Sequence, residues 1–151
     1  MPRQRAMHRP KSLMTPEQIA RCHARAFDGR GQVWSAQEIA DLLSSPHVFA
    51  IGDARCFAMG RVVAGEAELL TLACDPAHQG QGLGRACLAQ FETEARARNA
   101  QEIFLEVATD NIAAQALYTE TGYCEAARRQ GYYARQGEAP VDALILRKQS
   151  Q

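Results

Sequence analysis

Residues 79–85 read Gln-Gly-Gln-Gly-Leu-Gly-Arg and lie between an apolar run, residues 67–74, and a helical pattern that begins near Arg85. Glycine lets the backbone approach a ligand closely, and the first turn of a helix leaves N–H groups unpaired at the positive end of its dipole. A strand, a glycine-rich turn and a helix in this order therefore indicate an anion site for a phosphorylated ligand. The other interpretation, a tight packing turn, stays open at this point.

Two nucleotide-binding motifs do not fit this turn. A P-loop requires Lys and then Ser or Thr after its last glycine, whereas Arg85 follows Gly84. A dinucleotide fingerprint requires Gly-x-Gly-x-x-Gly, whereas Gly80, Gly82 and Gly84 are each two residues apart. The turn does fit a third pattern, Gln/Arg-x-x-Gly-x-Gly/Ala, which begins here at Gln79.

That third pattern is the pyrophosphate-binding signature of the GCN5-related N-acetyltransferases, which bind acetyl-CoA. The chain resembles this family beyond the turn, and residues 67–133 resemble its bacterial RimI type, which acetylates protein N-termini. The matching segments are residues 68–76, 79–85, 105–107, 111, 116–118, 122–123 and 131–133. The resemblance implies an α/β (α+β) fold in one domain, with a central mixed, mostly antiparallel sheet flanked by helices.

Local patterns predict the same order of elements. Capping boxes at residues 15–18 and 35–38 begin two helices, the first of which stops at Asp28-Gly29. Helical spacing predicts helices at 85–99 and 112–121, and we expect the charged side chains of the former to face water: Glu92, Glu94, Arg96 and Arg98. Strands are predicted at residues 47–51, 55–63, 67–74, 101–107, 123–128 and 143–147, with a loop between the last two and a further candidate at 9–14.

Size and composition are those of an ordinary globular domain. The 151 residues suffice for one domain, which we place at 13–151 behind a flexible N-terminal arm, residues 1–12. Lys+Arg and Asp+Glu both number 17, which argues against a general nucleic-acid binder. We find no apolar run long enough to span a membrane and no signal peptide.

Cysteine and histidine show no ligand pattern. The five cysteines contain no Cys-x-x-Cys pair, which favours reduced thiols in the cytoplasm over a disulfide framework. The four histidines lack metal-ligand spacing, so no metal is expected.

Two side chains are candidates for acid–base catalysis. Glu106 ends an apolar strand, on the opposite side from Leu105 and Val107, and could accept the proton of an amine. Tyr118 lies on the following helix and could protonate a leaving thiolate. From position alone, Glu106 could equally be a rim carboxylate paired with an arginine, and Tyr118 a packed aromatic. The resemblance assigns them as base and acid.

The resemblance also implies binding residues. The backbone of Leu72, Ala73 and Cys74 holds the acetyl and pantetheine part of acetyl-CoA, and Asn111 hydrogen-bonds the cofactor. The turn holds the pyrophosphate through Gln79, Gly80, Gln81, Gly82, Leu83, Gly84 and Arg85. The acceptor would contact three aromatic residues, which could instead anchor loops to the core: Trp34, Tyr132 and Tyr133.

Three positions depart from the usual pattern. Cys74 occupies a position where the family usually has valine, and Gln79 occupies one where arginine is commoner. Ala108 occupies a position where many RimI-type sequences have arginine. Cys74 is a mild departure because the main chain binds the cofactor there, whereas Gln79 removes one positive charge, which Arg85 could offset. Ala108 puts contacts with the acceptor in doubt, not the reaction.

The resemblance implies direct acetyl transfer in a ternary complex to a protein N-terminus, the alanine of a small-subunit ribosomal protein. A lysine side chain or a small amine is an alternative acceptor. A non-catalytic acetyl-CoA sensor is a third possibility, although the chain keeps both Glu106 and Tyr118. We expect a cytoplasmic monomer or weak dimer with no nucleic-acid or membrane partner.

Overall fold

The computed structural model describes residues 14–27 and 33–149. Two helices come first, α1 (Pro16–Ala26) and α2 (Ala36–Leu43), followed by three strands, β1 (Val48–Asp53), β2 (Cys56–Val63) and β3 (Glu66–Cys74). After a 3₁₀ turn (Pro76–His78) come α3 (Leu83–Ala97), β4 (Glu102–Ala108), α4 (Ile112–Glu120), β5 (Cys124–Arg135) and β6 (Glu138–Gln149). This order confirms the predicted one.

The helix starts confirm the capping patterns. Thr15 Oγ1 accepts a hydrogen bond from the Gln18 N–H at 3.1 Å, and the Gln18 side chain accepts one from the Thr15 N–H at 2.9 Å. Ser35 and Glu38 form the same reciprocal pair at the start of α2. The expected arm, residues 1–12, and the stop at Asp28-Gly29 lie outside the described residues. The same holds for the strand candidate at 9–14, except for its last residue, which is in no strand.

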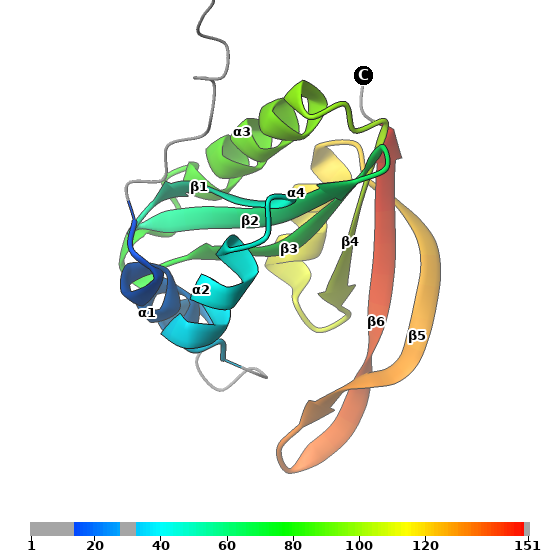
Figure 1. Cartoon of the computed structure of the whole chain (residues 1–151). Coiled ribbons are helices and arrows are strands. Elements are labelled where there is room, and N and C mark those ends of the chain that lie inside the picture. The colour runs from blue at the N-terminus through cyan, green and yellow to red at the C-terminus, as the bar shows by residue number, and fades with distance from the viewer. Residues whose placement is uncertain (1–13, 28–32, 150–151) are drawn as a thin grey trace, which may run out of the picture.

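The six strands form one sheet in the order β1-β2-β3-β4-β6-β5 (Figure 1). β3 and β4 pair in parallel, and the other neighbouring strands pair antiparallel. The sheet is thus mixed and mostly antiparallel, which confirms the predicted fold class. In Figure 1, α1 and α2 lie on one face of the sheet, and α3 and α4 lie on the other.

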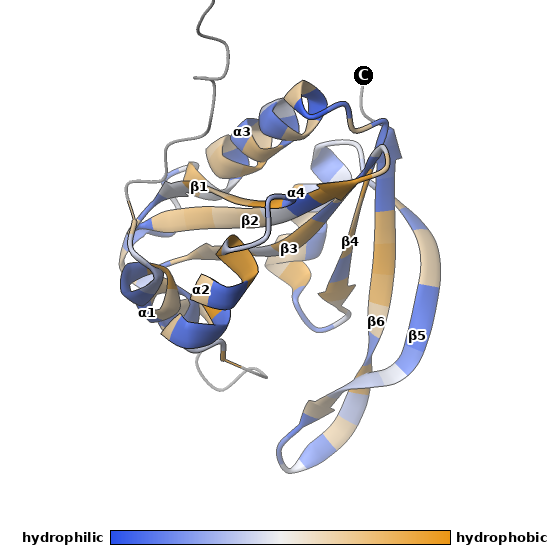
Figure 2. Cartoon of the chain, viewed as in Figure 1, coloured by the Kyte–Doolittle hydropathy of each residue, from blue (hydrophilic) through white to orange (hydrophobic). Residues whose placement is uncertain are grey.

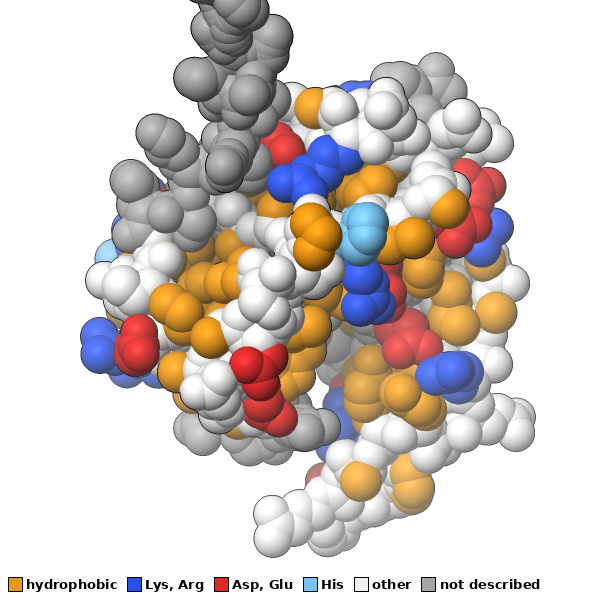
Figure 3. All heavy atoms as spheres, viewed as in Figure 1, with side chains coloured by type: hydrophobic (Ala, Val, Ile, Leu, Met, Phe, Trp, Pro, Cys, Tyr) orange, Lys and Arg blue, Asp and Glu red, His pale blue; other side chains and the backbone are white. Residues whose placement is uncertain are grey.

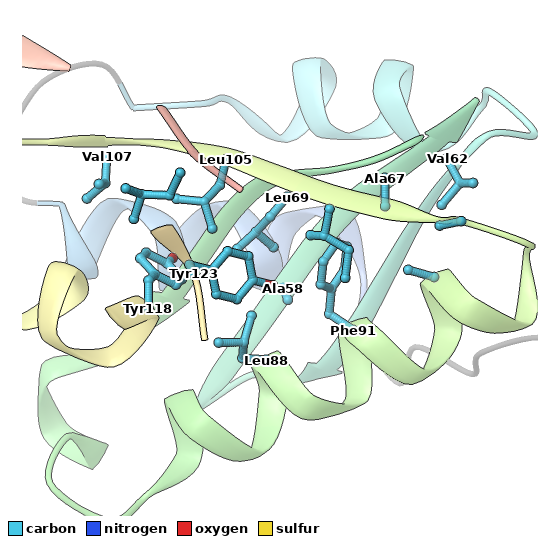
Figure 4. Close-up of a cluster of buried hydrophobic side chains, with 14 of the residues drawn as sticks. Ala58, Val62, Ala67, Leu69, Leu88, Phe91, Leu105, Val107, Tyr118 and Tyr123 are labelled. Atoms are coloured by element: carbon cyan, nitrogen blue, oxygen red, sulfur yellow. The ribbon is translucent and has the colours of Figure 1, made fainter. Parts of the chain in front are cut away.

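Each face of the sheet has its own core. Side chains alternate along β2, so that Ala58 and Val62 pack under α3 whereas Phe57 and Met59 pack under α1 and α2. The larger core also contains aromatic residues of α3 and of the α4–β5 region (Figure 4), and its central ring, Phe91, is fully buried. Burial on both faces fixes the register of the strands and hence the position of every residue at their ends.

The expectation that the charges of α3 all face water is wrong for two residues. Glu92 and Glu94 are buried, because each has a cationic partner. Lys148 Nζ lies 3.1 Å from Glu92 Oε2, and Arg98 Nε lies 2.9 Å from Glu94 Oε2. Arg96 is exposed, as expected.

The prediction of a loop between the two closing strands is also wrong. β5 and β6 run on to Arg135 and Glu138 and form a long hairpin that projects from the body of the domain (Figure 1). In Figure 2, β5 alternates between hydrophilic and paler segments, whereas the middle of β6 is hydrophobic. Gly131 and Pro140 suggested a break, but Gly131 lies in a bulge of β5 and Pro140 lies beyond the part of β6 that pairs with β4.

All five cysteines are free thiols, and Cys22, Cys56 and Cys87 are buried. None of the helices in the described ranges has the length and apolar character needed to cross a membrane.

Candidate active site

The parallel strands β3 and β4 part in the middle of the sheet. They pair from Glu66 with Glu102 to Leu69 with Leu105, yet β3 continues to Cys74 and β4 to Ala108. The parting coincides with a bulge in β3. Leu69 pairs with Gly60 and Thr71 with Met59, so Leu70 has no partner of its own in β2. The facing edges of β3 and β4 beyond this point are therefore not joined to each other.

A cavity of about 630 Å³ occupies the gap. Its walls come from both faces of the sheet, since His23, Phe27 and Trp34 belong to the α1–α2 side whereas Ala114 and Tyr118 belong to α4. The remaining walls are residues 69–72 of β3, 105–108 of β4, Asp110, Asn111 and residues 132–135 of the hairpin. Figure 3 shows the surface hollowed between the α1–α2 part and the hairpin. Two ligands could thus meet here from opposite faces.

Glu106 lines this cavity from β4. Its side chain is 29% exposed, and Oε2 lies 3.2 Å from Arg129 Nη1 on the hairpin. The residue therefore has the features of both sequence interpretations, because it is a carboxylate in the cavity and it is paired with an arginine.

Tyr118 lines the same cavity from α4 and is only 6% exposed. Its ring contacts the Tyr123 ring edge to face, with ring centroids 5.7 Å apart. Both side chains are labelled in Figure 4. Its hydroxyl has no hydrogen-bond partner among the described residues. Burial, and to a smaller degree the Cys56 thiol, raises the pKa of Tyr118 above its ordinary value, so the phenol is protonated at neutral pH.

The glycine turn has the geometry of an anion site. Gly80 and Gly82 both adopt φ +79°, and a Cβ at either position would meet no atom within 4 Å. Gly82 is the N-cap residue of α3 and gives no side-chain cap, so the first N–H groups of the helix are left for water or a ligand. Packing therefore does not require these glycines, whereas the backbone conformation does.

The side chains flanking this turn are engaged. Gln79 Nε2 donates to the Cys74 carbonyl at 3.1 Å and closes the turn onto the end of β3. Arg85 pairs with Glu120 at 2.6 Å, although both side chains are largely exposed. Neither the turn nor Ala73 and Cys74 line the cavity.

Asn111 begins α4 and lines the cavity. Its side-chain oxygen accepts from the Ala114 N–H at 3.2 Å, which leaves the amide NH₂ for a ligand. Ala108, the position of the missing arginine, also lines the cavity, and its carbonyl accepts from Gln115 Nε2 at 3.2 Å.

The predicted residues thus fall into two groups. Seven line one cavity: Trp34, Leu72, Glu106, Asn111, Tyr118, Tyr132 and Tyr133. The others lie at the end of β3 and in the turn that follows: Ala73, Cys74, Gln79, Gly80, Gln81, Gly82, Leu83, Gly84 and Arg85.

Sequence reasoning missed four further residues of the site. His23 is 4% exposed and stacks on Trp34, with ring centroids 5.1 Å apart and a 7° interplanar angle. The Phe27 ring also contacts His23, with ring centroids 4.7 Å apart and a tilt of 35° between the two rings. Burial lowers the pKa of His23, which keeps the ring neutral at neutral pH. Its place on the inward face of an amphipathic helix was visible in the sequence, but that pattern indicates core and not a cavity wall.

The other two are arginines of the hairpin. Arg129 pairs with Glu106, and Arg135 forms a two-pronged pair with Asp110 at 2.8 and 2.9 Å. No local sequence signal could have found these pairs, because their partners lie on other elements. Within the described ranges, no group of three His, Cys, Asp or Glu side chains is placed to hold a metal ion.

Comparisons with known proteins agree with this geometry. The sequence model of the acetyltransferase (GNAT) family matches residues 18–123. The [ribosomal protein bS18]-alanine N-acetyltransferase of Escherichia coli K12 is 41% identical over 95 residues, which span 63% of this chain and 64% of that relative. The N-alpha-acetyltransferase RimI of Mycobacterium tuberculosis is 33% identical over 143 residues, 89% of this chain and 86% of the relative.

The fold matches as well. The crystal structure of the ribosomal-protein-S18-alanine N-acetyltransferase from Escherichia coli superposes with a TM-score of 0.82 at 32% identity, covering 93% of this chain and 92% of the other. This likeness extends over β5 and β6, which lie beyond the part matched by the family model.

Proposed function

Because the chain belongs to the acetyltransferase (GNAT) family, we propose that it transfers the acetyl group of acetyl-CoA to the N-terminus of a protein. The acceptor in this proposal is the N-terminal alanine of a small-subunit ribosomal protein, as the names of its relatives suggest. The alignment with the E. coli relative covers less than two thirds of that protein, so activity and acceptor are both part of the proposal.

The observation that carries the proposal is the cavity between the parted strands. It holds a carboxylate, Glu106, and a protonated phenol, Tyr118, in one space that is lined by residues from both faces of the sheet. Acyl transfer to an amine needs these two groups, one to accept a proton and one to donate it.

Acetyl-CoA fits the residues present. Two positive-φ glycines and an N-cap without a side-chain cap form an open cradle for its pyrophosphate at the start of α3. The unpaired edge of β3 near Leu72 and the free amide of Asn111 offer hydrogen bonds to its pantetheine part. When bound, acetyl-CoA supplies the activated acetyl thioester.

Each catalytic group then moves one proton. An acceptor that arrives as an ammonium ion first loses one proton to solvent. Glu106 then accepts the second proton, which the neutral amine loses as nitrogen bonds to the acetyl carbon. Tyr118 donates its hydroxyl proton to sulfur as the carbon–sulfur bond breaks. An N-terminal amine, with a pKa of roughly 7.7–8.0, needs a weaker base than a lysine at about 10.4, which suits a carboxylate. A phenol is a weaker acid than a thiol, so this step requires Tyr118 to lie against the sulfur.

We propose direct transfer without an acyl-enzyme. Among the described residues that line the cavity there is no cysteine or serine, and the one threonine, Thr71, has no hydrogen bond to a base that would activate it as a nucleophile. We also propose a cytoplasmic location and a monomer or weak dimer; five free thiols are compatible with a reducing compartment.

Two peptides test the acceptor. One has a free N-terminal alanine and no lysine, and the other has a blocked N-terminus and one internal lysine. Each peptide is incubated with acetyl-CoA and enzyme, and its mass is then measured by mass spectrometry. We expect an added acetyl group on the first peptide alone. Acetylation of the second alone would move the activity to lysine, and failure of both while acetyl-CoA still binds would contradict peptide acetylation.

A further inference from the structure

Two arginine–carboxylate pairs join the projecting hairpin to the opposite rim of the cavity. Arg129 pairs with Glu106 on β4, and Arg135 pairs with Asp110 at the start of α4. Both carboxylates line the cavity. The two pairs differ in one respect that matters for the reaction, since only Glu106 is the proposed base.

A bulge in β5 sets the position of Arg129. Arg129 lies opposite Ala143 and Tyr133 opposite Val141, so three residues of β5 face the single residue Asp142. The Gly131 N–H donates to Asp142 Oδ1 at 2.9 Å, and Gly131 adopts φ +57°. The bulge turns the chain so that the carbon of the Arg129 guanidinium lies 4.6 Å from the centroid of the Tyr132 ring. The guanidinium thus has two neighbours, a carboxylate and an aromatic face.

This arrangement sets up a competition for Glu106. At pH 7, below the roughly 7.7–8.0 of an N-terminal amine, the acceptor arrives mostly as an ammonium ion. An ammonium and a guanidinium would then compete for the same carboxylate. Arg135 cannot simply replace Arg129 there, because Asp110 holds it at 2.8 and 2.9 Å.

We propose that Arg129 is a positioning residue that holds the Glu106 carboxylate until the acceptor ammonium displaces it. The guanidinium then keeps its contact with the Tyr132 ring, so it leaves the carboxylate without becoming fully solvated. This proposal rests on the function proposed above, with Glu106 as base and a cationic amine as acceptor.

The ion pair is weak enough to be displaced. Its side chains are 50% and 29% exposed, and pairs of this kind are commonly worth no more than about a fivefold change in an equilibrium constant. The acceptor therefore loses up to about fivefold in affinity by having to displace Arg129.

The test compares Arg129→Ala with two controls. We expect Arg129→Ala to bind the free-alanine peptide about two- to fivefold more tightly. Its kcat should change by less than about twofold, and its affinity for acetyl-CoA should stay the same. Arg129→Lys keeps the charge and should keep the original affinity. Arg147→Ala removes a matched pair, since Arg147 lies 3.2 Å from Glu102 with exposures of 49% and 31%, and should change nothing.

A double-mutant cycle shows whether Arg129 acts through Glu106. Peptide binding is measured on the complex with CoA through the fluorescence of Trp34, the single tryptophan of the chain and a residue of the cavity wall. In the Glu106→Gln background, Arg129→Ala should no longer tighten binding, because the competition has been removed.

Three results would overturn the proposal. Weaker peptide binding by Arg129→Ala would make the arginine a contact for the acceptor, and unchanged binding would make the pair a surface contact without function. If the unmodified enzyme acetylates neither peptide and binds neither, the proposed function falls together with this inference. Acetylation of the free-alanine peptide with unchanged binding in Arg129→Ala removes the inference alone.

Discussion

Tyr118 and Tyr123 provide a test that separates catalysis from stability. The two rings are neighbours in one core, 5.7 Å apart, and both are nearly buried, at 6% and 3% exposure. Their hydroxyls differ. Tyr118 lines the cavity and its hydroxyl has no partner among the described residues, whereas that of Tyr123 donates to Glu92 Oε2 at 2.8 Å. Replacing each by Phe removes one oxygen and keeps the ring.

The two substitutions should have opposite effects. Tyr118→Phe loses no hydrogen bond to any residue that the structure describes, so its free energy of unfolding should change by less than about 0.5 kcal/mol. Loss of a general acid should lower kcat by about 100-fold or more. Tyr123→Phe loses a buried hydrogen bond to a carboxylate, worth about 1.5–3 kcal/mol, and should lower Tm by roughly 3–12 °C while kcat stays within about twofold.

Both quantities are measured on the same preparations. Thermal unfolding followed by circular dichroism gives Tm, and mass spectrometry of the free-alanine peptide gives the initial rate at saturating acetyl-CoA. If Tyr118→Phe keeps more than half of kcat, the phenol is a packed aromatic and not the acid. If Tyr123→Phe loses as much activity as Tyr118→Phe, the rate effect comes from disturbed packing and the assignment fails.

Three further predictions concern the base, the turn and the buried histidine. Glu106→Gln should leave acetyl-CoA affinity intact and lower kcat about 100-fold, and an unchanged rate would dismiss Glu106 as the base. Gly82→Val should abolish acetyl-CoA binding in calorimetry, whereas Gly137→Val, which has a similar φ (+73° against +79°) and equally open space, should retain it; equal binding by both would contradict a pyrophosphate site. Burial lowers the pKa of His23, so below about pH 6.5 the unfolded chain binds more protons than the folded protein. The free energy of unfolding should therefore decrease as the pH is lowered, by at most about 1.4 kcal/mol per pH unit, until the pH reaches the folded-state pKa. In urea unfolding at several pH values, His23→Phe should lack this contribution, and equal pH slopes for the variant and the unmodified protein would refute it.

Much of the fold could be predicted because its signals are local. The capping boxes at Thr15 and Ser35 involve residues three apart, and both form as the sequence indicates. The glycine turn likewise specifies its own backbone, although α3 begins at Leu83, two residues before the predicted start, because Gly82 already serves as N-cap. These features depend on neighbours in sequence, which a pattern can contain.

The errors concern features that depend on distant partners. Glu92 appeared to be a solvent-facing charge, but Tyr123 and Lys148, which follow it by 31 and 56 residues, satisfy its carboxylate in the core. The hairpin appeared to be a loop because Gly131 and Pro140 suggest breaks, whereas cross-strand contacts to Asp142 stabilise the bulge.

In the candidate site, too, the features with local sequence signals could be predicted and those that depend on distant partners could not. Glu106 and Tyr118 were found through family motifs, and the structure places both in one cavity. The cavity itself has no signature in the sequence, since it exists because the pairing of β3 and β4 stops at Leu69 and Leu105. The ion pair of Arg129 with Glu106, on which its proposed role depends, could not be predicted from the sequence because the two residues lie on different strands.

The parting of β3 and β4 has a consequence for inhibitor design. If the coenzyme and the acceptor approach from opposite faces, a single compound that joins a coenzyme A moiety to a short peptide through a two-carbon bridge would pass through the gap and be held at both ends. Once one end is bound, the other is presented at an effective concentration in about the millimolar range, so the compound should bind roughly 100-fold more tightly than either part. Its selectivity would come from the peptide half, which under the proposed function would contact the cavity walls formed by Trp34 and the hairpin.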